Sequence, residues 1–179
     1  MGEKEEFAII LDYLPYGYPM SQKRLPTAQA IGEKTLALLE LIPRRGITLS
    51  VKQKIYIGEG KREEIYYIAG RLQREKLTET AKIQLQEFVE KVVAEQEGKY
   101  VDFFNNANAI NTRLHQIELL PGFGKKHTKE ILEEREKNKF ASFDEIKSRL
   151  SGIPDPRKAI EKRIMEELIE RQRFALFVR

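Results

Sequence analysis

The segment from Leu119 to Thr128 constrains the fold and chemistry of this chain more than any other. Two glycines, Gly122 and Gly124, flank one apolar residue between helix-compatible segments at 112–119 and 125–137. This pattern predicts two helices joined by a tight turn. The first N–H groups of the second helix would have no helical acceptor, and with the positive end of the helix dipole they suit a phosphate oxygen. Glycine permits positive φ and a close approach of the ligand.

Two lysines at the start of the second helix add positive charge beside this turn. We therefore treat the turn as a candidate nucleic-acid-binding site, formed by Gly122, Phe123, Gly124, Lys125, Lys126 and Thr128. The alternative is a plain helix connection that needs glycine only for its tight geometry.

The spacing of these residues resembles the helix-hairpin-helix family of nucleic-acid-binding motifs. The family pattern is apolar, any residue, Gly, apolar, Gly, three residues and a small residue, which here runs from Leu120 to Thr128. Thr128 stands where the family usually has Ala, so we expect slightly looser contact between the helices. The resemblance implies contacts to backbone phosphates, which position a ligand without reading its sequence.

The flanking segments extend this resemblance over about residues 108–170. Residues 109–112 and 140–146 are similar to parts of the tandem helix-hairpin-helix domain of bacterial DNA-uptake proteins, which implies a second hairpin at 150–155. Pro154 has no N–H group to offer there, and Asp155 is acidic. We expect this second hairpin to be structural and a poor phosphate site.

Residues 7–74 read as rich in β-strands. Apolar runs at 7–11 and 35–42 indicate strands, and an alternating pattern at 49–57 predicts a third. A glycine-containing turn at 58–61 then predicts that a strand at 64–69 returns beside it. Several short strands with such turns predict a small barrel, for which an OB-like fold is our first choice.

Thr78 begins the clearest isolated helix, which we expect to end near Gln96, before Gly98. Residues 100–109 read as a connection, and four short helices follow. The predicted fold class is α+β, a small OB-like β-barrel followed by a connecting helix and a tandem helix-hairpin-helix bundle. The predicted domains are 1–75, 76–98 and 99–179.

The β-rich region supplies further candidate contacts. Basic candidates are Arg44, Arg45, Lys52 and Lys54, for which the alternative is a solvated face. Tyr16 and Tyr18 lie in a segment rich in proline and tyrosine, and exposed aromatic rings stack on unpaired bases. Such a segment is equally typical of a well-packed turn.

The modest positive net charge is compatible with a polyanion partner and is not by itself evidence for one. The net charge is +4; residues 1–98 hold 15 basic and 15 acidic side chains, and residues 99–179 hold 17 and 13. The chain has no cysteine, which excludes disulfides and thiolate metal sites, and its two histidines lack a third ligand at metal spacing. No apolar run approaches the length of a membrane span. We expect a cytoplasmic protein with no metal and no cofactor.

Three functions remain open on these residues. The first is a non-enzymatic nucleic-acid-binding protein. The second is a protein–protein adaptor of a larger complex. The third is a DNA lyase or glycosylase, because Lys126 and Asp144 are spaced somewhat like the catalytic pair of helix-hairpin-helix glycosylases. Against that reading, Ser142 and Asp144 look like the cap and first turn of a helix, and no P-loop or nucleophilic triad is evident.

The whole arrangement is similar to an uncharacterised archaeal family of predicted RNA- or nucleotide-binding proteins. The similarity rests on Tyr13 to Tyr18, Ile42 to Gly46 and Ile117 to Lys126. It implies a nucleic-acid binder, with RNA slightly favoured over DNA, and no established reaction.

Overall fold

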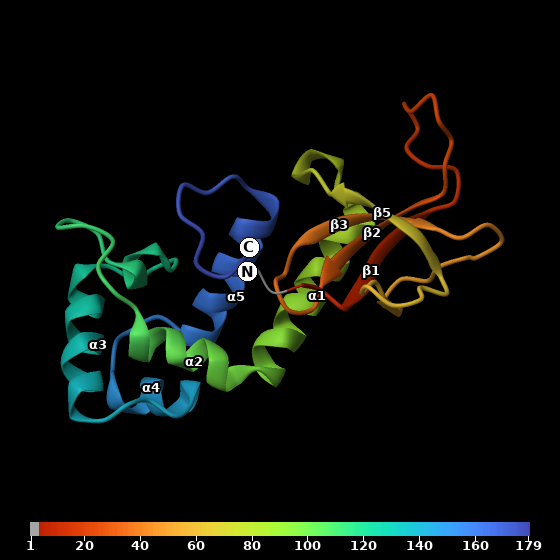
Figure 1. The fold of residues 1–179 in the computed structure, drawn as a ribbon. Coiled ribbons are helices and arrows are strands. Elements are labelled where there is room, and N and C mark those ends of the chain that lie inside the picture. The colour runs from red at the N-terminus through yellow and green to blue at the C-terminus, as the bar shows by residue number, and fades with distance from the viewer. Residues whose placement is uncertain (1–3) are drawn as a thin grey trace. The chain divides into compact units, whose positions relative to one another are not determined.

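The computed structural model describes residues 4–179, which divide into two compact units (Figure 1). The first unit runs to Glu87 and also contains Leu168–Arg179, and the second is Phe88–Glu167. The first holds a curled antiparallel sheet and the second is helical, so the chain is α+β as predicted. Two helices, α1 (Glu79–Glu95) and α5 (Pro156–Ile169), contribute residues to both units.

The sheet of the first unit is a curled half-barrel with strand order β4-β1-β2-β3-β5. All four strand pairings are antiparallel. The strands are β1 (Phe7–Leu14), β2 (Thr27–Gly32), β3 (Leu38–Pro43), β4 (Lys54–Tyr56) and β5 (Ile65–Arg71). The predicted strands at 7–11 and 64–69 are therefore confirmed, and the run at 35–42 forms a strand only from Leu38.

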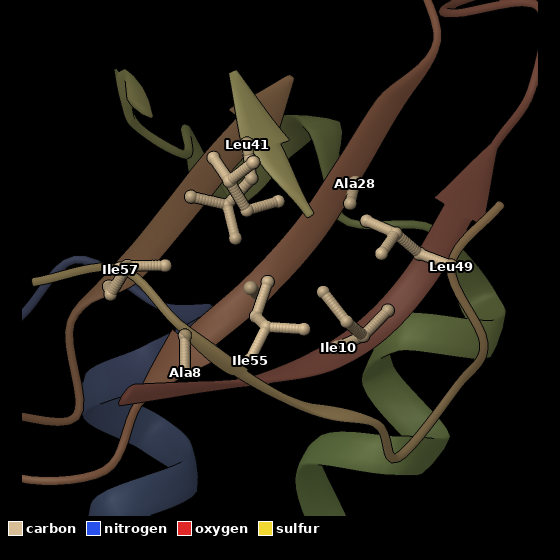
Figure 2. Close-up of a cluster of buried hydrophobic side chains, with 9 residues drawn as sticks. Ala8, Ile10, Ala28, Leu41, Leu49, Ile55 and Ile57 are labelled. Atoms are coloured by element: carbon tan, nitrogen blue, oxygen red, sulfur yellow. The ribbon is translucent and has the colours of Figure 1, made fainter. Parts of the chain in front are cut away.

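Part of the core of this unit lies on one face of the sheet (Figure 2). Alternate residues of the strands point to this face because the side-chain period of a strand is two. Small alanines on β1 and β2 leave room for larger side chains from neighbouring segments. The buried cluster consists of Ala8, Ile10, Ala28, Ala30, Leu41, Leu49, Ile55, Ile57 and Ile65.

Strand β2 was absent from the sequence-based prediction. All six of its residues are buried, so the segment lacks the alternation that marks a half-exposed strand, and its β-branched residues, Thr27 and Ile31, are separated by two alanines and Gln29. The Gln29 amide is satisfied locally. Its Nε2 donates to the Lys76 carbonyl at 2.7 Å, and its Oε1 accepts the Thr78 N–H at 3.1 Å.

The predicted hairpin between 49–57 and 64–69 is wrong. Only Lys54–Tyr56 forms a strand, because the chain turns at Lys52, whose φ is +71°. Strand β4 pairs with β1 and β5 pairs with β3, so the two lie at opposite ends of the strand order. Alternating burial across 49–57 arises partly from a loop that covers the core.

The second unit contains α2 (Glu97–Asn106), the short 3-10 helix η2 (Gln116–Leu119), α3 (Lys125–Lys137) and α4 (Phe143–Arg149). The predicted connection at 100–109 is wrong over most of its length. Helix α2 occupies it because Tyr100, Val101 and Phe104 form a buried helical stripe, while Gly98 lies exposed in its first turn.

The predicted helix at 112–119 is also wrong, since only its last four residues are helical. His115 and Glu118 start η2 with reciprocal caps: His115 Nδ1 accepts the Ile117 N–H at 3.2 Å, and Glu118 Oε2 accepts the His115 N–H at 2.7 Å. Residues before His115 turn instead, with the Ile110 N–H donating to the Leu114 carbonyl.

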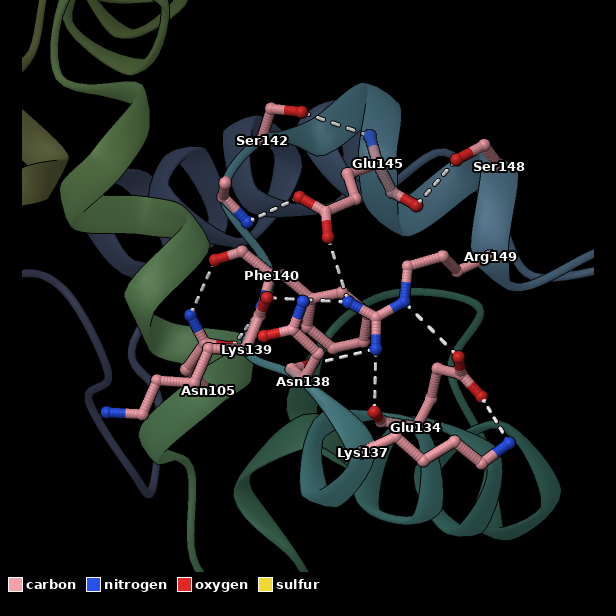
Figure 3. A network of polar contacts seen from close by, with 11 residues as sticks. Asn105, Glu134, Lys137, Asn138, Lys139, Phe140, Ser142, Glu145, Ser148 and Arg149 are labelled. Carbon is pink, nitrogen blue, oxygen red and sulfur yellow. Dashed lines mark hydrogen bonds and ion pairs between the residues drawn. The ribbon is translucent and has the colours of Figure 1, made fainter.

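Arg149 of α4 fixes the end of α3 (Figure 3). Its guanidinium donates to the carbonyls of Glu134 and Asn138, both at 2.7 Å, and pairs with the carboxylates of Glu134 and Glu145. The group also stacks on the Phe140 ring at 4.4 Å. A planar donor fork suits several carbonyls at a helix end. This clamp holds α3 against α4, so the start of α3 has a defined place in the unit.

Candidate nucleic-acid interface

The turn before α3 is tight and anchored at both ends. Leu120 and Phe123 are buried, and the Phe123 N–H donates to the Leu120 carbonyl at 3.0 Å. Gly122 lies between them with φ +84°, a conformation that side chains rarely adopt. Gly124 is the N-cap of α3 in an extended conformation. The buried pair thus holds two glycines at the surface of the unit.

The first turn of α3 presents backbone donors. The N–H groups of Lys125, Lys126 and His127 occupy the positions that have no intrahelical acceptor. Apart from Gly124 and its two chain neighbours, no described atom lies within 4 Å of a Cβ built on Gly124, so there is open space beside this cap residue. The N–H of Gly124 itself is occupied, because it donates to His127 Nδ1 at 3.0 Å. This bond assigns the imidazole proton to Nε2.

Thr128 is bonded within the helix start. Its side chain is buried, and its Oγ1 donates to the Gly124 carbonyl at 2.9 Å, while the looser contact between the helices stays a prediction. The Thr128 N–H donates to the same carbonyl at 3.0 Å. The hydroxyl therefore finds its partner within the turn.

The two lysines have different surroundings. Lys125 Nζ donates to the Arg113 carbonyl at 2.6 Å and lies 3.3 Å from Glu118 Oε1, so it ties α3 to the preceding segment. Lys126 has an 86% exposed side chain, with Glu130 Oε1 at 4.0 Å. Lys126 is thus the more available cation of the two.

Arg113 is a candidate that the sequence reasoning missed. It is exposed in the turn that Lys125 contacts, and the Asn111 side chain shapes this turn by accepting the Arg113 N–H at 2.8 Å. An asparagine two residues before a basic residue was the available signal, since asparagine favours such turns. Predicting a helix at 112–119 left this turn out of the sequence-based site.

A second loop, from Leu150 to Asp155, precedes α5. Gly152 also has φ +84°. Asp155 Oδ1 accepts the Lys158 N–H at 3.2 Å, so a carboxylate occupies this helix start. Burial raises the pKa of Asp155, but the Lys158 N–H bond and the Lys147 ammonium outweigh it, and the pKa is lowered. Pro154 packs on the first loop, because a Cβ at Gly122 would lie 3.2 Å from its Cγ.

The basic candidates of the first unit are mostly paired. Arg44 Nε donates to the Arg62 carbonyl at 2.7 Å, while Arg45 is exposed. Lys52 pairs with Glu87 at 2.8 Å. Lys54 pairs with Glu33 at 3.0 Å and lies over the Phe7 ring. The two arginines follow β3 and the two lysines lie at or beside β4, so they occupy separate parts of the sheet.

The two candidate tyrosines also differ. Tyr16 is 78% exposed. The Tyr18 hydroxyl donates to Glu40 Oε1 at 3.1 Å and accepts from Gln29 Nε2 at 3.2 Å. Burial, with a smaller contribution from Glu40, raises the pKa of Tyr18 to about 12 against the opposing Gln29 hydrogen bond. Tyr18 is therefore an anchor of its loop, and Tyr16 is the ring that faces solvent.

Residues of the enzymatic alternative occupy ordinary helix-start positions. The Ser142 side chain accepts the Glu145 N–H at 3.0 Å, and Asp144 is exposed in the first turn of α4, as predicted for both. Residues 4–179 contain no group of three or more side chains arranged to hold a metal ion. Over the same residues, no helix combines the length and the apolarity that a membrane span requires.

Comparison with known proteins places the chain in a family. A family model described as "Protein of unknown function (DUF655)" matches residues 4–179. The chain belongs to this family. It is similar to the uncharacterized protein MJ0038 of Methanocaldococcus jannaschii, with 41% identity over 98% of this chain and 80% of that protein. It is also similar to the crystal structure of Af1531 from Archaeoglobus fulgidus, with 43% identity, a TM-score of 0.82 and coverage of 98% of this chain and all of the other. The predicted membership of an uncharacterised family with archaeal members is confirmed.

Proposed function

We propose that this protein is a non-enzymatic nucleic-acid-binding protein that holds a backbone phosphate at the start of α3, with RNA slightly favoured over DNA. One observation carries the proposal. The first turn of α3 presents unaccepted N–H groups at an open glycine cap, beside the exposed side chain of Lys126. A phosphate oxygen there would receive charge-assisted hydrogen bonds and would meet the positive end of the helix dipole.

The proposal includes a finer description of the fold. The η2-turn-α3 segment serves as the binding helix-hairpin-helix, with its first helix reduced to a 3-10 turn, and α4-loop-α5 is its structural partner. The curled five-stranded sheet serves as an OB-like domain. Support comes from the strand number, the open half-barrel and the two glycines with φ +84° that stand 30 residues apart.

The contacts expected at this site are to backbone and carry no sequence information. Arg113 and Lys126 would neutralise neighbouring phosphates, while Lys125 mainly maintains the loop. The preference for RNA rests on the archaeal family resemblance and on the exposed aromatic ring of Tyr16.

We propose no catalytic role for Lys126. A nucleophilic lysine needs a desolvated pocket or a neighbouring cation that favours its neutral form, whereas this side chain is 86% exposed with a carboxylate nearby. A borohydride-trapped adduct with abasic DNA that disappears in Lys126→Ala would overturn this part of the proposal.

The binding test uses the full chain and labelled single strands of RNA and DNA at several salt concentrations. The variants are Lys126→Ala and Arg113→Ala, each expected to weaken binding and to lower the salt slope by about one released counterion. Lys91→Ala is the matched control, because Lys91 is also exposed and lies 3.9 Å from a carboxylate one turn ahead, that of Glu95.

Equal effects of all three substitutions would reject the site at α3. Absence of binding to any strand at low salt would reject the proposal as a whole and would favour the adaptor role.

A further inference from the structure

The loop between β1 and β2, residues 15–26, projects away from the strands that it joins (Figure 1). It exposes three large apolar side chains. Met20 is 96% exposed, Tyr16 is 78% exposed and Leu25 is 44% exposed. Exposing three large apolar side chains to water on a single loop does not help folding, and exposed apolar side chains on one segment are typical of binding surfaces.

This β1–β2 loop has an internal scaffold. Gly17, with φ +70°, approaches the opposite side of the loop so closely that a Cβ there would lie 2.6 Å from the Leu25 carbonyl oxygen. The Gly17 N–H donates to the Leu14 carbonyl, and the Ser21 N–H to the Tyr18 carbonyl, both at 3.1 Å. The hydroxyl of Tyr18 is held by Gln29 and Glu40 as described above. A loop held at its base in this way loses less conformational freedom on binding.

The charge of the segment selects the class of partner. Between Asp12 and Glu33 the sequence has no acidic residue, while Lys23 and Arg24 are both exposed in the loop. An anionic partner is therefore favoured. Stable attachment to a lipid surface takes a larger apolar face or a longer basic cluster than two charges and three side chains. Nucleic acid supplies both anionic phosphates and flat apolar faces.

We propose that the β1–β2 loop holds unpaired nucleobases, with Tyr16 as the stacking ring, Met20 and Leu25 beside it, and Lys23 and Arg24 against the adjoining phosphates. This inference rests on the proposed function and deepens it by naming the ligand as single-stranded nucleic acid with exposed bases. Stacking on an aromatic ring tolerates any base, so the loop would discriminate between paired and unpaired strands without reading sequence.

The test separates bases from phosphates. Two labelled strands of equal length are titrated with the full chain, one carrying bases and the other an abasic strand with the same phosphates. Tyr16→Ala is expected to weaken binding of the base-containing strand about tenfold and to leave the abasic strand unchanged. Tyr66→Ala is the matched control, because Tyr66 is a 65% exposed tyrosine on β5, outside the loop. The affinity of Tyr66→Ala for both strands should equal that of the parent chain.

Other outcomes are equally decisive. Lys126→Ala should weaken both strands, because its contact is to phosphate. If Lys126→Ala acts on both strands and Tyr16→Ala on neither, the loop inference fails while the proposed function stands. If neither strand binds, both fail. If the parent chain binds phosphatidylcholine–phosphatidylserine vesicles and Met20→Ala or Tyr16→Ala abolishes that binding, the loop is a lipid contact and the inference is overturned.

Discussion

The starts of α3 and α5 share one backbone device and differ in their chemistry. Each follows a buried leucine and a glycine with φ +84°, Gly122 in one case and Gly152 in the other. The cap of α3 is Gly124, which leaves the helix start open, whereas Asp155 places a carboxylate on the first turn of α5. The shared turn therefore brings a helix start to the surface. The charge of the cap residue then favours or opposes an anion at that helix start.

The two loops are also connected to each other. Pro154 of the second loop lies against Gly122 of the first. A loop whose own helix start is closed thus supports the loop whose helix start is open. We interpret the pair as a division of labour, with one loop binding and the other positioning it.

The largest effect is expected from giving α3 the cap of α5. In Gly124→Asp the new side chain meets open space, φ is −119°, and aspartate is a favoured N-cap, so the fold should be retained. Affinity for a nucleic-acid strand should fall at least about tenfold, because a fixed carboxylate occupies the phosphate position. Fluorescence anisotropy measures the affinity and thermal denaturation checks the fold. Unchanged affinity in a folded variant would contradict the assignment.

A matched pair of glycine substitutions is expected to have the next effect. Gly122→Ala and Gly152→Ala both place a side chain at φ +84°, which costs about 1–2 kcal/mol of unfolding free energy in each. Gly122→Ala should cost more, because its Cβ also meets Pro154 at 3.2 Å, while the Cβ at Gly152 has no described neighbour within 4 Å. Only Gly122→Ala should weaken strand binding. Chemical denaturation measures the stability of both variants, and anisotropy measures their affinity for the strand. An equal loss of affinity in the two variants would remove the distinction between the loops.

The two lysines of α3 should separate affinity from stability. Lys126→Ala should reduce affinity by about 1 kcal/mol and leave the unfolding free energy unchanged, because its side chain is exposed. Lys125→Ala should lower the unfolding free energy by about 1 kcal/mol, because it removes the bond to the Arg113 carbonyl and the pair with Glu118. The same denaturation and anisotropy assays apply. The reverse pattern would show that Lys125 leaves the loop to bind phosphate.

These lysines illustrate what sequence could and could not provide. The glycine spacing indicated the turn and the start of α3 correctly, because positive φ and helix caps are local properties. The partners of Lys125 depend on a turn near Arg113, where the sequence predicts a helix. Helix propensity at 112–119 does not reveal that His115 and Glu118 cap η2, so that this helix begins only at residue 116.

The sheet shows the same limit at longer range. Apolar runs located β1 and β3, but β2 was missed because it is buried throughout and because two alanines and Gln29 separate its β-branched residues, Thr27 and Ile31. Pairing of β5 with β3 could not be read from the turn at 58–61 either. Adjacent segments suggest a hairpin, whereas β4 pairs with β1 and β5 pairs with β3, which puts the two strands at opposite ends of the strand order.

Removing the charge at the closed start should have a smaller effect of opposite sign. Asp155→Asn retains a capping side chain, so stability should change little. Asp155 follows Pro154, which packs on Gly122 of the first loop, so the substitution removes a negative charge near that loop. Affinity for a strand should therefore rise, by less than about tenfold. Weaker binding of Asp155→Asn in the anisotropy assay would mean that the carboxylate positions the first loop rather than closing the second.

The smallest effect concerns His115, which caps η2 and so sets the entry to the first loop. Burial, followed by the Arg135 charge, lowers the pKa of His115 against the opposing Glu118. The unfolded histidine takes up a proton near its ordinary value of 6.5 while the folded one resists it. The stabilisation is therefore complete above that pH and is lost as the pH falls below it. Melting temperatures from pH 7.5 down to 5 should fall more in the parent than in His115→Asn, and parallel curves would contradict this role.

The central claim, that a phosphate binds at the start of α3 and not at the start of α5, is tested most directly by backbone amide NMR. The full chain, labelled with ¹⁵N, is titrated with a short single-stranded RNA. The account predicts saturable shifts of the Gly122 amide and of the amides at 125–127, with those at 151–153 and 157–158 unchanged. Saturable shifts at the second loop, or none at the first while the RNA binds, would contradict it.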